Sequence, residues 1–129
     1  FAAATREDAF RPKAALAAPA LAELAELDDA AFRKMFAKTA IKRTGRDHLI
    51  RNVMIAIGNT GDLSLVPVAE RALDDASPLV RAMAVWALGR LLDGESFAGL
   101  AAHHAAAETD DQVLEEWQAV TREPSAATA

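Results

Sequence analysis

Apolar residues recur every three or four positions along most of the chain, which is the period of one helix face. A helix expected from His48 to about Gly58 carries such a stripe, at Leu49, Ile50, Val53, Met54 and Ile57. A second helix, expected from Pro78 to Leu92, is apolar on nearly all sides. A helix of that kind is typically covered by several neighbours. The pattern therefore predicts an all-α protein with the second helix near its centre.

Punctuating residues set the other expected boundaries. Residues 1–18 are expected to form an extended lead, residues 19–123 a helical domain and residues 124–129 a frayed tail. Residues 38–46 are expected to form a connecting loop that contains Gly45. Pro67 should bend its helix or displace the true start, and Gly94 should end the helix that begins at Pro78. The expected N-caps are Asp28, Asp47, Asp62, Ser77 and either Thr109 or Asp110.

An internal repeat relates the two clearest helices. Leu49–Asn59 matches Leu79–Arg90 at an offset of 30 in the opening Leu-aliphatic-Arg and 31 in the closing Ala-aliphatic-Gly. Val113 continues the series at an offset of 33 from Val80. Periods in this range, with paired helices, indicate an α-solenoid of stacked antiparallel helix pairs. The stretch Asp75–Arg81 also resembles the start of the second helix of a HEAT repeat, so a HEAT-like fold is expected.

Composition limits the chemistry. The chain has 129 residues and no cysteine, which excludes disulfides, thiolate zinc sites and iron–sulfur clusters bound by the chain itself. It contains no apolar run of 18 residues, so no membrane span is expected. The first residues lack a methionine and the order of a secretion signal, so we expect a piece of a longer cytoplasmic protein.

The net charge of −5 is unevenly distributed: residues 1–32 carry −3, residues 33–51 carry +6 and residues 52–129 carry −8. Within the basic segment, Lys42, Arg43 and Arg46 fall on the expected loop and have no counterpart in the repeat. Arginine and lysine on an exposed loop can reach phosphate oxygens, so a polyanion site is one interpretation and a solvated loop is the other. Arg51 and Arg81 occupy equivalent repeat positions, where a structural ion pair is the simpler interpretation, for Arg81 with Asp75.

Other candidate groups give weaker evidence of a functional site. His104 and Glu108 are four residues apart, next to His103, but two ligands without a third make a surface role the simpler reading. Trp86 and Trp117 lie on helix faces and are expected in the core. The sequence shows no nucleophile–base set and no glycine-rich phosphate loop.

The stretch from Leu27 to Leu92 resembles the C-terminal HEAT-like domain of epoxyqueuosine reductases. The resemblance rests on elements found here in the family's order and spacing: Phe32 and Phe36, Ile41-Lys42-Arg43-x-Gly45-Arg46, Leu49-x-Arg51-Asn52, Ile55-Ala56-Ile57-Gly58-Asn59, and Ser77-Pro78-Leu79-Val80-Arg81 with Trp86-Ala87-Leu88. It implies an oxidoreductase of queuosine biosynthesis that reduces epoxyqueuosine to queuosine at the wobble base of tRNA.

The resemblance also implies that the catalytic chemistry and the binding of tRNA involve different domains. Two 4Fe–4S clusters and cobalamin would be bound by upstream catalytic domains, and this piece would bind no cofactor and contribute no catalytic residue. It would help to hold the tRNA, with Lys42, Arg43, Arg46 and Arg51 contacting phosphates near the anticodon arm. A generic HEAT scaffold that binds proteins is the alternative. A self-contained enzyme is disfavoured because no catalytic set is present.

Overall fold

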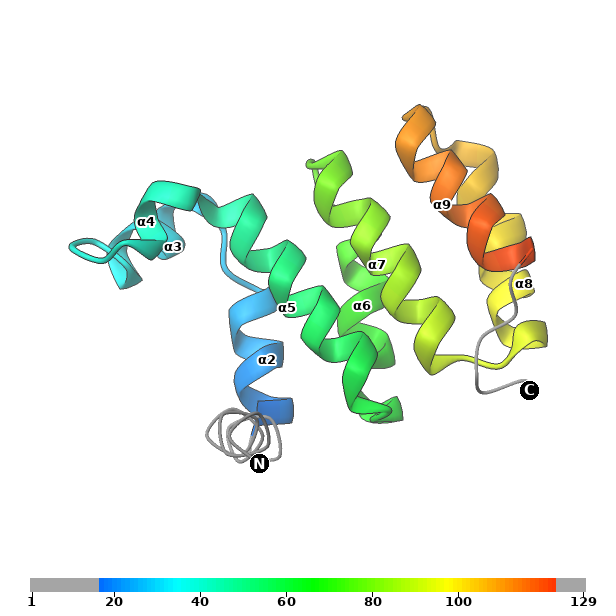
Figure 1. The fold of residues 1–129 in the computed structure, drawn as a ribbon, viewed down its shortest axis with the longest axis horizontal. Coiled ribbons are helices and arrows are strands. Elements are labelled where there is room, and N and C mark those ends of the chain that lie inside the picture. The colour runs from blue at the N-terminus through cyan, green and yellow to red at the C-terminus, as the bar shows by residue number, and fades with distance from the viewer. Residues whose placement is uncertain (1–16, 123–129) are drawn as a thin grey trace, which may run out of the picture.

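The structure, a computed structural model, describes residues 17–122, which are entirely helices and connecting turns (Figure 1). No β-strand occurs within this range, so the predicted all-α fold is confirmed. The expected lead and tail fall almost wholly outside the described residues. At the lead's inner edge, α2 (Ala17–Ala25) begins two residues before Pro19, which lies in its first turn. Proline is tolerated there because a first-turn N–H has no partner within the helix.

The helices form two stacked layers. The helices α5 (Arg46–Thr60), α7 (Pro78–Leu91) and α9 (Asp111–Arg122) lie side by side and run in the same direction (Figure 1). Behind them, α2 packs against α5, α6 (Val66–Ala72) against α7, and α8 (Gly94–His104) against α9. This arrangement is the predicted solenoid of helix pairs.

The core lies between the layers and is centred on α7, which contacts α5, α6, α8 and α9. Its Val80, Val85 and Leu88 are fully buried. Further buried side chains come from both layers: Ile50, Met54, Ile57, Leu65, Val68, Phe97, Val113 and Trp117. The helix predicted to be covered on several sides is therefore the central one.

Several predicted boundaries are confirmed. Asp28 caps α3 (Asp29–Met35) by accepting from the Ala31 N–H at 2.8 Å. Asp62 caps a short 3-10 helix (Leu63–Leu65), and Pro67 is the second residue of α6, so the helix start is displaced as expected. Pro78 opens α7 after Ser77, which holds the N-cap position but whose side chain makes no capping hydrogen bond. Asp110 accepts from the N–H groups of Gln112 and Val113 at the start of α9.

Other boundaries differ. The prediction that Gly94 ends the second helix is wrong: α7 ends at Leu91, and Gly94 is the first residue of α8. The Asp93 carboxylate accepts from the Ser96 N–H at 2.7 Å, so the chain re-enters a helix at once. After α8 ends at His104, the chain continues as a 3-10 helix (Ala105–Ala107). Asp47 is not a cap; it lies in the first turn of α5, which Gly45 precedes with a φ of 88°.

The expected loop at 38–46 is partly helical. A single turn, α4 (Ile41–Thr44), follows α3. The two connect α2 to α5 in the chain and project from one end of the stack (Figure 1). We call residues 28–45 the basic excursion. Its Phe32 is buried against Phe36, with ring centroids 5.2 Å apart, but is not part of the main core cluster.

Candidate nucleic-acid interface

The basic excursion presents exposed cations. Lys34, Lys38, Lys42 and Arg43 are all exposed, and among the described residues none of their side chains forms an ion pair or hydrogen bond. Arg33 differs, because its guanidinium lies 3.1 Å from the Asp29 carboxylate. Unpaired cations on a projecting segment can approach a polyanion without first breaking a contact within the protein. Lys34 and Lys38 belong to this group although only the charge count singled them out in the sequence.

Local backbone geometry sets where Lys42 and Arg43 lie. Both are on α4 rather than on an open loop. The turn before α4 is held by the Thr39 hydroxyl, which donates to the Phe36 carbonyl at 2.8 Å, and it includes Lys38 with a φ of 143°. Gly45, with a φ of 88°, ends α4 and leads directly into α5. Positive φ is rare for a residue with a side chain, so this turn follows an unusual backbone path.

Arg46 is not a free cation of this group. Its Nη2 donates to Asp75 Oδ1 at 2.6 Å and its Nη1 to Asp75 Oδ2 at 3.0 Å, while its Nε donates to the Leu27 carbonyl at 2.8 Å. Nη1 also lies 3.2 Å from Asp47 Oδ1. The side chain is 16% exposed. The prediction placed Arg46 on an open loop; the structure instead places it at the start of α5 with its donors already engaged.

Arg46 and Asp75 each stabilise the charged form of the other. Burial by itself would raise the pKa of Asp75, but hydrogen bonds from Arg46 and from the Ser77 N–H, with the attraction of the guanidinium, leave it lowered. The hydrogen bond to the Asp75 carboxylate raises the pKa of Arg46. Both side chains are therefore held in their charged forms.

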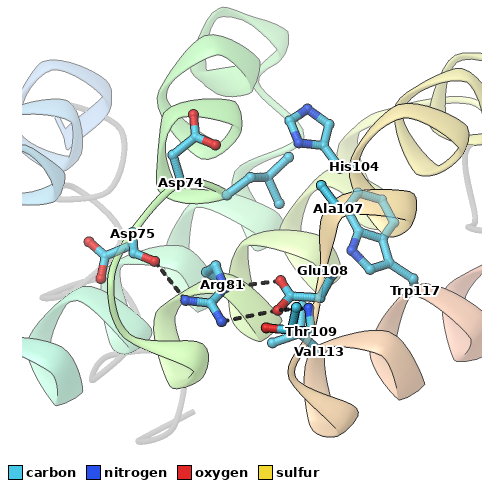
Figure 2. Close-up of a pocket in the computed structure, with 10 residues that line it drawn as sticks. Asp74, Asp75, Arg81, His104, Ala107, Glu108, Thr109, Val113 and Trp117 are labelled. Carbon is cyan, nitrogen blue, oxygen red and sulfur yellow. Dashed lines mark hydrogen bonds and ion pairs between the residues drawn. The ribbon is translucent and has the colours of Figure 1, made fainter.

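Arg81 forms the equivalent contact one repeat later, but not with the predicted partner. Its Nε and Nη2 donate to the two carboxylate oxygens of Glu108, each at 3.0 Å (Figure 2). Its Nη1 donates to the main-chain carbonyls of Asp75 and Ala76 rather than to the Asp75 carboxylate. The pairing of Arg81 with the Asp75 side chain was therefore wrong, because the guanidinium reaches forward to the next turn and Arg46 already holds that carboxylate.

A pocket of about 310 Å³ opens beside this ion pair, lined by Asp74, His104 and Trp117 among others (Figure 2). The His104 ring is stacked on Trp117 at 6.2 Å between centroids. The Glu108 carboxylate also accepts from the N–H groups of Thr109 and Asp110, and its pKa is lowered mainly by the hydrogen bond from Arg81. With its oxygens so engaged, Glu108 is a poor partner for His104 in a metal site.

The other residues named from the sequence lie outside the basic excursion. Arg51 is half-buried on α5, and no ion pair of its side chain occurs among residues 17–122. Trp117 is buried at 3% exposure, as expected for a core residue. Trp86 is only partly buried, with the Arg90 guanidinium 5.7 Å from its ring centroid. His48 is exposed in the first turn of α5.

Two further features are absent from the described residues. No group of three or more His, Cys, Asp or Glu side chains there could hold a metal ion. No helix in that range is both long enough and apolar enough to cross a membrane.

Comparisons with known proteins agree with the fold. The profile of the HEAT-repeat family matches residues 40–120. An epoxyqueuosine reductase from Yersinia pestis is 29% identical over 92 residues, which cover 71% of this chain and 22% of that protein. One from Salmonella typhimurium is 33% identical, covering 69% of this chain and 23% of that protein. An uncharacterised protein from Geobacillus stearothermophilus is 29% identical over 65% of this chain and 39% of its own length.

These matches are partial. This chain spans between 22% and 24% of the length of the epoxyqueuosine reductases from Yersinia pestis and Shigella dysenteriae. No solved structure matches it.

Proposed function

Because the chain belongs to the HEAT-repeat family, we propose that it is the tRNA-positioning domain of an epoxyqueuosine reductase. In this proposal the exposed cations of the basic excursion contact tRNA phosphates near the anticodon arm. The similarity to epoxyqueuosine reductases over about 70% of the chain supports the choice of enzyme, and the name of those relatives supplies the reaction class.

The observation that carries the proposal is the state of the cations. Lys34, Lys38, Lys42 and Arg43 are exposed on one projecting segment of an otherwise acidic chain, and residues 17–122 give their side chains no ion-pair partner. Phosphate contacts orient a nucleic acid but do not read its sequence. The role is therefore to position the RNA, while the acidic surface elsewhere disfavours RNA placed wrongly.

The four residues predicted to bind tRNA do not contribute equally. Lys42 and Arg43 are the principal phosphate ligands of the proposal because both are exposed on α4. Arg51 is a weaker helper because it is half-buried on α5. Arg46 is left out of the phosphate set, since its donors are committed to Asp75, Asp47 and Leu27.

The redox chemistry belongs to the rest of the proposed enzyme. The resemblance implies two 4Fe–4S clusters and cobalamin, but this chain has no thiolate to hold a cluster. The described residues offer no metal-binding group in its place. The residues present therefore do not fit the clusters. For cobalamin, the proposal follows the resemblance, which places its site in the upstream domains, and no chemical step is assigned to this chain.

The proposal is tested by measuring tRNA affinity at several salt concentrations for the double variant Lys42→Ala/Arg43→Ala. Each lost phosphate contact should flatten the slope of log affinity against log salt by about 0.7 to 0.9. The control is Arg71→Ala/Arg90→Ala, which removes the same charge from exposed positions outside the excursion. If both doubles change affinity and slope equally, only net charge matters and the excursion is not the interface. Salt-insensitive RNA binding, or none in the parent, would favour a protein-binding scaffold instead.

A further inference from the structure

Arg46 joins three parts of the chain that are distant in sequence. Its contact with the Leu27 carbonyl spans 19 residues, and its contact with the Asp75 carboxylate spans 29. Leu27 immediately precedes the basic excursion, and Arg46 immediately follows it. The guanidinium therefore closes the base of the excursion and ties that base to the turn before α7.

Other anchoring of the excursion is sparse. Phe32 is its one buried side chain in the described structure, and this ring lies outside the main core cluster. The excursion's helices α3 and α4 have only limited contact with α5. With little apolar surface holding the segment, the polar contacts at its base have a large share in fixing its orientation.

The geometry of these contacts is demanding. A bidentate pair with Asp75 and a third bond from Nε to a carbonyl use the planar fork of the guanidinium, which a lysine cannot reproduce. Asp75 is 12% exposed at its side chain, so loss of its partner would leave a poorly solvated carboxylate.

A comparison with Arg81 shows what is particular to Arg46. Each arginine reaches back to a main-chain carbonyl and forward to a carboxylate placed three residues before the next helix of the layer, Asp75 before α7 and Glu108 before α9. Arg81 reaches back only to the turn beside its own helix. Arg46 reaches back across the whole excursion that carries the exposed cations.

We propose that Arg46 is a positioning residue, which through Asp75 and Leu27 holds the basic excursion at a fixed orientation on the solenoid so that Lys42 and Arg43 meet RNA phosphates together. This inference rests on the proposed function for its RNA part. It assigns Arg46 a role distinct from direct phosphate contact, and it makes an acidic residue, Asp75, a contributor to the binding of an anion.

The expected contribution of Asp75 distinguishes a positioning role from a direct effect of charge on RNA affinity. Asp75→Asn keeps an oxygen that can accept from the Ser77 N–H, but it removes the charge that holds Arg46. By its charge alone, neutralising an acid near an RNA site should raise RNA affinity. If Asp75 holds the excursion in place through Arg46, Asp75→Asn should instead loosen the excursion and lower RNA affinity on the order of tenfold. The control is Asp74→Asn, the neighbouring exposed acid, which should leave affinity unchanged or raise it.

The experiment combines two measurements on the parent, Arg46→Lys, Asp75→Asn and Asp74→Asn. Hydrogen exchange, which needs no RNA, should show amides of residues 29–44 exchanging on the order of tenfold faster in Arg46→Lys and Asp75→Asn, with those of α7 and α9 unchanged. Titration with tRNA should show weaker binding for the same two variants and an unchanged salt slope, because no phosphate contact is lost.

The outcomes are distinct. Unchanged exchange in the excursion overturns the positioning role. So does an Asp75→Asn variant that binds RNA more tightly than the parent, or an Arg46→Lys variant with a flattened salt slope. If instead Lys42→Ala/Arg43→Ala leaves RNA binding intact, the proposed function fails, while the exchange data still decide whether Arg46 and Asp75 hold the excursion.

Discussion

Gly58 on α5 lies so close to Trp86 on α7 that a β-carbon at position 58 would come within 2.6 Å of Trp86 Cζ3. The same β-carbon would lie 3.1 Å from the Ala87 Cα. Gly89 repeats the relationship one helix later, where a β-carbon would collide with Val120 of α9. The repeated Ala-aliphatic-Gly motif therefore sets the close spacing of the α5–α7–α9 layer.

Gly58→Ala is expected to destabilise the fold by about 1–3 kcal/mol, because either the Trp86 ring or the helix backbone must move. Urea denaturation followed by circular dichroism measures this. Gly99→Ala is the matched control, since Gly99 lies within α8 and has open space around its β position. That change should be neutral or stabilise by up to about 1 kcal/mol. Equal effects at the two positions would show that spacing is not the function of Gly58.

Leu88→Ala should cost about 2–5 kcal/mol, because this side chain of α7 is fully buried in the core and its loss leaves a cavity. Leu63→Ala makes the same chemical change at a side chain that is 64% exposed, and it should alter the free energy of unfolding by no more than about 0.5 kcal/mol. Chemical denaturation of both variants checks the pair. A small loss at Leu88 would mean that α7 is not the centre of the core.

The Arg81–Glu108 pair should make stability depend on pH. The lowered pKa of Glu108 means that its contribution is fully present above the ordinary value of 4.5 and is lost as the pH falls through the lowered folded value. Glu108→Gln should therefore destabilise at pH 7 and reduce the loss of stability on acidification. Denaturation curves at pH 7 and pH 3 test this, with the exposed Glu115→Gln as the control. An unchanged acid dependence in Glu108→Gln would contradict the assignment.

Glu116 should behave in the opposite way. Burial raises the pKa of this carboxyl, so its charged form is less favourable in the folded protein than in the unfolded chain. Glu116→Gln is expected to stabilise the protein at pH 7, and the gain should disappear as the pH falls below the ordinary value of 4.5. Melting temperatures of the variant and the parent across this range measure the effect. Destabilisation at pH 7 would reveal a favourable partner for the charged carboxylate.

The repeat could be read from the sequence because its signals are local. Apolar periodicity, Pro78 at a helix start, and caps such as Asp28 and Asp110 act within a few residues, so each helix is specified near where it forms. Errors arose where one local signal competed with another. Gly94 is usually a helix terminator, but the Asp93 cap begins a new helix at that point.

The partners of the arginines could not be read in this way. In the internal repeat of the sequence, Arg51 and Arg81 hold equivalent positions within their two helices. In the structure, the residue equivalent to Arg81 is instead Arg46, because each of these two binds a carboxylate in the turn before the next helix of the layer. Ion pairs between successive repeats depend on which turns lie next to each other, and the stacking of the helices determines those neighbours.

That this protein is a stack of helices with one compact basic segment follows from its amino-acid order, because helix period and charge order are properties of neighbouring residues. Which cations of that segment are available to a ligand depends instead on how the helices pack. Asp75, 29 residues away, lies beside Arg46 and removes it from the exposed set, while Lys42 and Arg43 stay open to solvent. A guanidinium binds a carboxylate that is near it in space, and the fold, not the order of residues, sets that distance.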